Sequence, residues 1–351
     1  MRFYTAEINN KEEILVAFAE GNVAYRMSRL QKLVPALNFA DMNDLIRNIT
    51  AEHKEKLARF AANSDVLSGA EVNLEEVKLC APIVHPRQDV ICLGINYFAH
   101  GVEAGHFSEE AFGGERPYTI YFSKRVNKAT ATGEGIPAYE GLVDSLDYEV
   151  ELGVVLGKDA KNVTKEEALD YVFGYTVIND VSARNLQTRH KQWYMGKSLD
   201  GFTPMGPCIV TADEIADVQN LDIKCTVNGE VRQDSNTKLM MQTVAGAISE
   251  LSQGITLQAG TIIATGTPAG VGMGMKPPCF LKHGDEIIFE FSARSFLHHM
   301  VRNIVGTLIE IGLGKPYDID EILASKNRSA AGPTAPADGL YFIRADYASG
   351  D

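Results

Sequence analysis

Three carboxylates occupy two places where the sequence constrains their geometry. Glu149 and Glu151 lie two residues apart in the apolar, β-branched run DYEVELGVVLGK, and residues two apart in a β-strand point to the same face. Asp180 ends a second predicted strand, residues 175–179. Carboxylates brought together repel one another unless a cation neutralises them, and an oxygen-only set suits a hard divalent ion. The spacing therefore points to a Mg²⁺ or Mn²⁺ site.

Such a site would be open, which is typical of catalytic metal centres. Three protein ligands leave about three of roughly six octahedral positions for water or for a chelating substrate. We expect Asp180 to cap the next helix and to share one helical face with Arg184 and Gln187. A plainer alternative makes Glu149 and Glu151 the solvated face of an edge strand, and Asp180 only an N-cap.

Other segments carry groups suited to proton transfer and to anion binding. His100 and Glu103 stand three apart in GINYFAHGVE, and a histidine oriented by a carboxylate is the usual general base near neutral pH. Lys197 lies in the predicted loop GKSLDGFTPMGP, where it could hold an anionic carbonyl oxygen. The glycine-rich stretch TGTPAGVG, with Gly266 and Thr267, could offer amides and hydroxyls to a carboxylate. The alternatives are an exposed loop pair, a solvated lysine and an ordinary glycine-rich turn.

Composition indicates a cytoplasmic protein that acts on small molecules. The 351 residues are 45% hydrophobic and carry a formal net charge of −13, so the chain lacks the concentrated positive field that nucleic acids require. Five cysteines are scattered without a CxxC pair, which favours reduced thiols over a disulfide framework or a zinc site. The sequence shows neither an export leader nor an apolar run approaching ~18 residues, so we expect no membrane insertion.

The chain is predicted to fold as two domains followed by a distinct tail. Residues 1–82 would form a small N-terminal α/β domain without visible chemistry. Pro82 and Pro86 mark its boundary with a larger domain, residues 83–291. The smaller elements that we expect are a strand at 1–8 with a partner at 22–25, amphipathic helices at 41–62 and 165–171, a hairpin around Asn228-Gly229, a helix to Leu251 and a strand at 284–291.

Several segments, in this order, resemble the fumarylacetoacetate hydrolase family over about residues 83–291. The matching stretches are GINYFAHGVE, DYEVELGVVLGK, GYTVINDVSARNLQ, GKSLDGFTPMGP, VNGEVRQDSNT and TGTPAGVG ahead of GDEI. The resemblance implies an α+β fold, the family's mixed β-roll, usually as a homodimer. It also implies a bound Mg²⁺, Mn²⁺ or Ca²⁺ ion on Glu149, Glu151 and Asp180. The positions that match the family's catalytic and substrate-holding residues are His100, Glu103, Lys197, Arg184, Gln187 and Thr267, with Gly266 beside the last.

The resemblance further implies a substrate class, namely 2-oxo acids that chelate the metal through their carboxylate and 2-oxo oxygens. The metal and Lys197 would stabilise enolate charge, while His100, held by Glu103, would activate water or move a proton. With water as nucleophile, the site would cleave the carbon–carbon bond of an acylpyruvate of the fumarylpyruvate type, which is the preferred interpretation. Without water, the same site would decarboxylate or tautomerise oxaloacetate, or isomerise 2-hydroxyhepta-2,4-diene-1,7-dioate.

Residues 292–351 resemble a different family, at the C-terminal end of the tRNA pseudouridine synthase that modifies the anticodon arm. The stretches are ARSFLHHMVRNIVGTLIEIGLGK and ASKNRSAAGPTAPADGLYFIRADY. Arg302 matches an arginine beside that family's catalytic aspartate, but the GRTDAG-type segment that carries this aspartate is absent from the sequence. We expect a helical appendage that arose by gene fusion near the GDEI segment. A truncated RNA-modifying or RNA-binding function is the rival hypothesis.

Overall fold

The computed structural model describes residues 1–61, 67, 69–115 and 117–292. The described residues form one compact unit. The predicted appendage at 292–351 lies outside the described residues, apart from its first residue. Within the described part, no helix is both long and apolar enough to cross a membrane.

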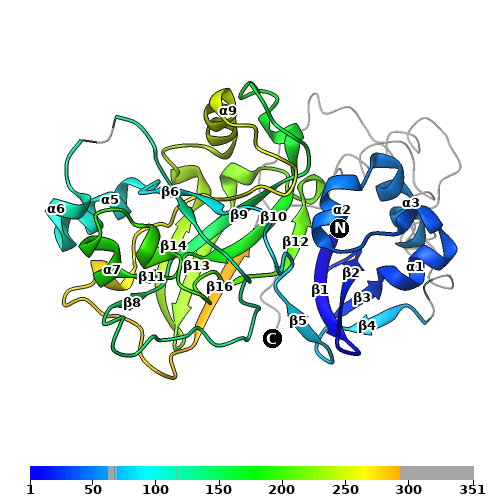
Figure 1. Ribbon diagram of the computed structural model, residues 1–351, viewed down its shortest axis with the longest axis horizontal. Helices are drawn as coiled ribbons and strands as arrows, with labels where there is room; N and C mark the ends of the chain where they lie inside the picture. The colour runs from blue at the N-terminus through cyan, green and yellow to red at the C-terminus, as the bar shows by residue number, and fades with distance from the viewer. Residues whose placement is uncertain (62–66, 68, 116, 293–351) are drawn as a thin grey trace, which may run out of the picture. The chain divides into compact units, whose positions relative to one another are not determined.

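A mixed eleven-stranded sheet runs through the compact unit (Figure 1). Its order is β4 (Glu71–Asn73), β3 (Val23–Arg26), β2 (Lys11–Ala17), β1 (Arg2–Ile8), β12 (Met205–Thr211), β10 (Val172–Asn179), β9 (Val150–Leu156), β15 (Ile262–Ala264), β6 (Val90–Gly94) and β7 (Ile120–Lys124), with β5 (Lys78–Cys80) beside β1. Among the described strands of this sheet, only β6 and β15 pair in parallel. The predicted α+β class is confirmed. Because β1 pairs with β12, the N-terminal strands continue the sheet of the larger segment; the domain boundary at residue 82 stays a prediction.

Two smaller sheets and several helices complete the described part of the chain. The smaller sheets pair β8 (Leu146–Asp147) with β11 (Ser182–Ala183), and β13 (Asp222–Val227) with both β14 (Glu230–Asn236) and β16 (Ile287–Ser292). The helices are α1 (Met27–Leu33), α2 (Met42–Asn48), α3 (Ala51–Ala61), α5 (Phe98–Phe107), α6 (Glu109–Phe112), α7 (Arg184–Arg189), α8 (Tyr194–Lys197) and α9 (Val244–Gly254).

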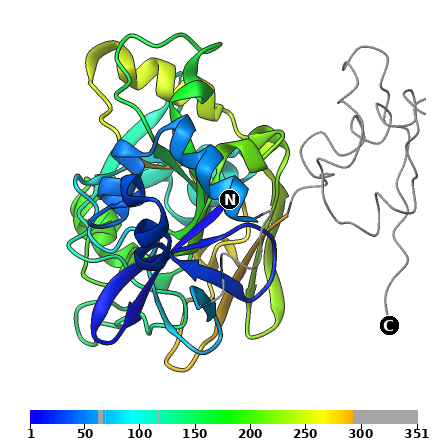
Figure 2. The same ribbon diagram turned by 90° about the vertical axis from the view of Figure 1, so that its right-hand side faces the viewer.

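The two faces of the large sheet pack against different helices, as β9 shows. Val155 of β9 belongs to a core that includes Leu45 of α2 and Leu57 of α3. Its neighbour Val154 belongs to another core with Ile248 of α9. Successive strand residues point to opposite faces, so the N-terminal helices cover one face and α9 covers the other. Figures 1 and 2 show α1, α2 and α3 at one end of the compact unit, next to the N-terminal strands.

Local turn chemistry accounts for several differences from the expected elements. The hairpin partner of β1 is β2 rather than residues 22–25, because Asn9 and Asn10 both adopt positive φ and form a two-residue loop. The helix expected at 41–62 is two helices, since the Thr50 hydroxyl accepts a hydrogen bond from the His53 amide and starts α3 anew.

Two more elements can be compared with the structure. The segment 165–171 forms only a short 3₁₀ turn, Ala168–Tyr171, before β10 begins at the next residue. The hairpin expected around Asn228-Gly229 is confirmed, with both residues at positive φ between β13 and β14.

Close approach of β10 to β12 should make Gly174 sensitive to substitution. A Cβ atom at Gly174 would lie 2.3 Å from the carbonyl oxygen of Val210. Gly174→Ala should therefore lower the free energy of unfolding by about 1–3 kcal/mol, measured by urea denaturation. Gly105→Ala is a matched control, because its added Cβ on α5 would meet nothing within 4 Å and alanine favours a helix. Equal unfolding midpoints for the two variants would contradict this packing.

Candidate active site

Glu149 and Glu151 are buried at the start of β9 rather than on a solvated edge. β9 pairs with β10 on one side and with β15 on the other, so the edge-strand alternative is wrong. The two side chains are 4% and 1% exposed. One carboxylate oxygen from each of Glu149, Glu151 and Asp180 lies within 4.8 Å of the other two. The convergence that the sequence spacing predicts is therefore present in the fold.

Asp180 follows β10 but does not cap a helix. The short strand β11 comes next, and α7 begins only at Arg184 with Ala183 at its N-cap. The predicted cap is wrong, because the pairing of β11 with β8 keeps the chain extended for two more residues. Asp180 is instead fixed by lysine side chains, which the sequence analysis did not anticipate.

Lys124, the last residue of β7, holds one oxygen of Asp180. Its ammonium group donates to Asp180 Oδ1 and to the carbonyl oxygens of Val181 and Phe202, the last two at 3.2 and 2.8 Å. Lys124 and Asp180 are both fully buried. An ammonium group has three hydrogen atoms to donate, so all three of this lysine are used within the protein.

Lys197 lies at the end of α8 rather than in the predicted loop, and its side chain is buried. Its Nζ atom is 2.8 Å from Glu149 Oε2 and 2.7 Å from Asp180 Oδ2. Burial alone would lower the pKa of Lys197, but the charges of Asp180 and Glu149 outweigh it and raise the pKa. Lys197 therefore stays an ammonium ion between two of the three carboxylates.

Arg184 and Gln187 meet on one face of α7, as their spacing predicts. The Arg184 Nη1 atom is 2.6 Å from Glu149 Oε1 and donates to Gln187 Oε1 at 3.0 Å. The Nε atom donates to Asp147 Oδ2 at 2.9 Å. The Nη2 atom is buried and has no hydrogen-bond partner among the described residues. Buried polar groups normally have a partner, so this atom marks a place for a ligand.

His100 and Glu103 are in contact on α5, because the turn after β6 is helical. His100 Nδ1 lies 3.2 Å from Glu103 Oε2, and His100 is 4% exposed. Glu103 also accepts hydrogen bonds from the Gly270 amide at 2.9 and 3.2 Å. With Nδ1 directed at a carboxylate, the other ring nitrogen, Nε2, is the one available for proton transfer.

The glycine-rich loop after β15 uses its amides inside the protein. The Gly266 amide donates to Glu151 Oε2 at 2.8 Å. The Thr267 hydroxyl donates to the Val150 carbonyl oxygen and accepts a hydrogen bond from Gln233. These groups orient β9 and its carboxylates, and a substrate-binding role for Gly266 and Thr267 stays a prediction.

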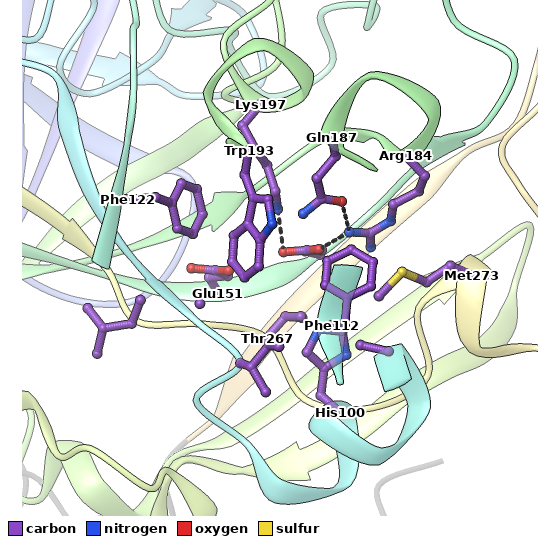
Figure 3. Close-up of a pocket in the computed structure, with 15 residues that line it drawn as sticks. His100, Phe112, Phe122, Glu151, Arg184, Gln187, Trp193, Lys197, Thr267 and Met273 are labelled. Atoms are coloured by element: carbon purple, nitrogen blue, oxygen red, sulfur yellow. Dashed lines mark hydrogen bonds and ion pairs between the residues drawn. The ribbon is translucent and has the colours of Figure 1, made fainter. Parts of the chain in front are cut away.

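One pocket, shown in Figure 3, has an aromatic wall beside its polar and charged groups. The polar and charged residues that line it are His100, Glu149, Glu151, Arg184, Gln187, Lys197 and Thr267. Lys197, Gln187 and Arg184 reach the pocket from one side, and His100 lies opposite them. Three aromatic side chains also line it, and Trp193 packs against both Phe112 and Phe122, with ring centroids 5.7 and 5.2 Å apart. The pocket thus combines a polar, charged side with an apolar one.

With every carboxylate ionised, the charges of the site do not balance. Asp147, Glu149 and Asp180 each pair with Lys124, Lys197 or Arg184. Glu151 has no ion pair among the described residues, and burial together with the charges of Asp180 and Glu149 raises its pKa well above the usual range. A divalent ion beside Glu151 would supply the missing positive charge. The donor set, three buried carboxylates, therefore fits a hard metal ion.

Sequence reasoning missed Lys124, Asp147 and the aromatic wall. Lys124 ends a strand, which usually means a solvated position, and its partner Asp180 is 56 residues away. Asp147 begins the DYEVE segment, but no spacing rule links it to Arg184, 37 residues further on. Phe112, Phe122 and Trp193 come from separate elements, and the sequence shows no pattern that joins them.

Comparison with known proteins identifies the family. The chain matches the model of the fumarylacetoacetate (FAA) hydrolase C-terminal family over residues 89–308. It is 45% identical over 236 residues to oxaloacetate tautomerase YisK of Bacillus subtilis (strain 168), covering 67% of this chain and 77% of that relative. The protein belongs to the fumarylacetoacetate hydrolase family, a family of enzymes.

Solved structures agree with this assignment. Fumarylacetoacetate hydrolase from the psychrophilic Exiguobacterium antarcticum has a TM-score of 0.67 and 35% sequence identity, covering 84% of this chain and 96% of that one. Maleylpyruvate hydrolase from Sphingobium sp. SYK-6, solved with manganese(II) and pyruvate, has a TM-score of 0.62 and 28% sequence identity. The match covers 83% of this chain and 95% of that one.

The end of the chain matches a second family. The model of tRNA pseudouridine synthase matches residues 278–348 and overlaps the first match over residues 278–308. The hydrolase-family match thus continues past its expected end at residue 291, and the overlap contains the GDEI segment. Most of the second match lies outside the described residues, so the appendage and the gene fusion stay predictions.

Replacing Glu151 should reverse the order of stability between metal-free and metal-bound protein. A raised pKa means that the folded protein loses stability as pH rises above the ordinary glutamate value of ~4.3. At pH 8 with a chelator, the free energy of unfolding of Glu151→Gln should therefore exceed that of the wild type by roughly 1 kcal/mol. The variant should accordingly unfold at a higher temperature. With excess Mn²⁺ the wild type should be the more stable, because ligand binding stabilises the folded state.

The control for this experiment is Glu290→Gln on β16, whose side chain is 63% exposed. It should not change stability in either condition. Differential scanning calorimetry in chelator and in Mn²⁺ gives both comparisons. The same stability order in both conditions would contradict a metal site at Glu151.

Proposed function

We propose that the protein is a divalent-metal-dependent enzyme that converts the keto and enol forms of a small 2-oxo acid, with oxaloacetate as the first candidate. The supporting observation is the arrangement of three buried carboxylates within 4.8 Å of one another beside Lys197, Arg184 and the His100–Glu103 pair. The 45% identity to an oxaloacetate tautomerase favours this reaction. Each group then has a distinct task.

Glu149, Glu151 and Asp180 would hold the metal ion. All three are oxygen donors, so Mg²⁺ and Mn²⁺ are the first candidates and Ca²⁺ is the third. When bound, the ion would polarise the 2-oxo group of the substrate and so lower the cost of forming an enolate. Lys124 donates to Asp180 Oδ1 and Lys197 donates to Asp180 Oδ2, so both oxygens are held in place and the ion would share one of them with a lysine.

Arg184 and Lys197 would bind the negative charges of the substrate. Arg184 offers its unpartnered Nη2 atom to the substrate carboxylate, with Gln187 steadying the guanidinium. Lys197 carries a full positive charge in a buried setting, where electrostatic stabilisation is stronger than in water. Its ammonium group would stabilise charge on the 2-oxo oxygen as the enolate forms.

His100 would move the proton that separates the keto and enol forms. Glu103 fixes the ring through Nδ1, so Nε2 can exchange a proton with C3 of the substrate. In ketonisation the enol hydroxyl on C2 gives up its proton to water and the protonated ring delivers one to C3. In the reverse direction the neutral ring takes the C3 proton and the 2-oxo oxygen is protonated. The Gly270 amide holds Glu103 from the other side. Phe112, Phe122 and Trp193 would exclude water from the apolar side of the pocket.

Hydrolysis of an acylpyruvate is the second candidate, and it is the preferred interpretation of the sequence alone. The His100–Glu103 pair supports it, because the same base can activate a water molecule. The likeness to a maleylpyruvate hydrolase also supports it. Decarboxylation of oxaloacetate and isomerisation of a dienoic acid would use the same metal and the same lysine.

An assay panel tests the proposal. The purified chain should accelerate ketonisation of enol-oxaloacetate in the presence of Mg²⁺ or Mn²⁺ and lose this activity in chelator. Acetylpyruvate cleavage and oxaloacetate decarboxylation, measured alongside, decide between the candidates. No turnover of any of these substrates with metal would contradict the proposed function.

Two variants separate metal binding from proton transfer. Glu149→Ala should lose both Mn²⁺ binding and turnover, because it removes a ligand. His100→Ala should keep Mn²⁺ binding but lose about 100-fold or more in kcat. His106→Ala, an exposed histidine on the same helix, is the control and should keep both. Full activity of His100→Ala would contradict the role of this histidine.

A further inference from the structure

Asp147 is a fully buried carboxylate whose two oxygens each accept two hydrogen bonds. Oδ1 accepts from the amides of Tyr148 at 3.0 Å and Gly272 at 2.7 Å. Oδ2 accepts from the Met273 amide at 3.0 Å and from Arg184 Nε at 2.9 Å. One side chain thus joins β8, the first residue of α7 and the loop after β15.

These contacts determine how the Arg184 guanidinium is turned. Asp147 occupies the Nε edge, while Glu149 and Gln187 occupy Nη1. The nitrogen left over is Nη2, which is buried without a partner in the described part of the chain. A guanidinium is planar and its donors have a fixed geometry, so fixing Nε and Nη1 also fixes the direction of Nη2.

The same carboxylate holds the loop that bounds the pocket. Met273 lines the pocket, and its amide is one of the donors to Asp147. Three residues earlier in this loop, the Gly270 amide holds Glu103, the partner of His100. A Cβ atom at Gly272 would lie 2.7 Å from Asp147 Oδ1, so the loop approaches Asp147 as closely as a glycine allows.

We propose that Asp147 is a positioning residue that aims Arg184 Nη2 at the substrate carboxylate and ties this arginine to the loop that carries Met273. The proposal rests on the proposed function, in which Arg184 binds the substrate. Asp147 itself is not one of the three carboxylates that converge on the metal site. Its effect should therefore appear in ligand affinity and not in metal affinity.

Asp147→Asn is the direct test, because asparagine has nearly the same shape. Both oxygens of Asp147 face N–H donors, so either orientation of the asparagine amide directs its own NH₂ group at two donors. The charge opposite Arg184 Nε is also lost. The affinity for oxalate, a mimic of the 2-oxo acid, should fall about tenfold or more with Mn²⁺ saturating. The Mn²⁺ affinity should stay within about twofold, both measured by calorimetry.

A double-mutant cycle shows whether Asp147 acts through Arg184. Arg184→Gln alone should weaken oxalate binding. The double variant with Asp147→Asn should then bind oxalate less than about twofold more weakly than Arg184→Gln does. Additive losses would overturn the proposal. Unchanged oxalate affinity in Arg184→Gln would instead contradict the proposed function, which distinguishes the two failures. Asp285→Asn, whose side chain accepts from Lys282 and Asn228, is the matched control and should change neither affinity.

The remaining outcomes also decide the matter. Normal oxalate affinity in Asp147→Asn overturns the proposal, and so does a parallel loss of Mn²⁺ and oxalate affinity, which would indicate a general structural role. If Asp147→Asn does not fold, Gly272→Ala replaces it, because the added Cβ would lie 2.3 Å from the Cys279 carbonyl oxygen and 2.7 Å from Asp147 Oδ1, so that the loop must shift away from Asp147. Gly272→Ala should lower the affinity for oxalate and leave the affinity for Mn²⁺ unchanged. Unchanged oxalate affinity would overturn the proposal.

Discussion

Repulsion among buried carboxylates is the constraint on which the site depends. Glu149, Glu151 and Asp180 lie within 4.8 Å of one another, and burial strengthens the interaction between their charges. Lys124, Lys197 and Arg184 compensate their neighbours, but Glu151 has no ion pair in the described part of the chain. With all of these carboxylates ionised the site has one negative charge without a partner, which a cation beside Glu151 would neutralise.

The fold brings the charged groups together because neighbouring central strands begin or end close to one another. β10 and β15 both run antiparallel to β9. The last residue of β10 pairs with Val150 and that of β15 with Gly153, so the segments that follow both strands lead toward the start of β9. Asp180 follows β10, the loop with Gly266 follows β15, and Glu151 is near the start of β9. Apolar side chains fill both faces of the same strands further along. The hydrophobic core therefore supports a pocket whose polar groups could not be buried on their own.

The sequence predicts those parts of the site that depend on short-range spacing. Strand alternation pairs Glu149 with Glu151, and helical spacing pairs His100 with Glu103. Prediction from spacing fails where the partner is distant in the chain, as for Lys124 with Asp180. It also fails for the glycine-rich loop, where the amides serve carboxylates of the protein itself. No local pattern shows which acceptor a backbone amide will find.

We propose that one divalent cation is bound by Glu149, Glu151 and Asp180. The most direct measurement is anomalous diffraction at the manganese edge from crystals grown with Mn²⁺. The account predicts one strong anomalous peak at about 2.0–2.3 Å from an oxygen of each of the three carboxylates, with open positions facing His100 and Arg184. A map with no peak between these side chains, or with the three carboxylates turned apart, would contradict the account.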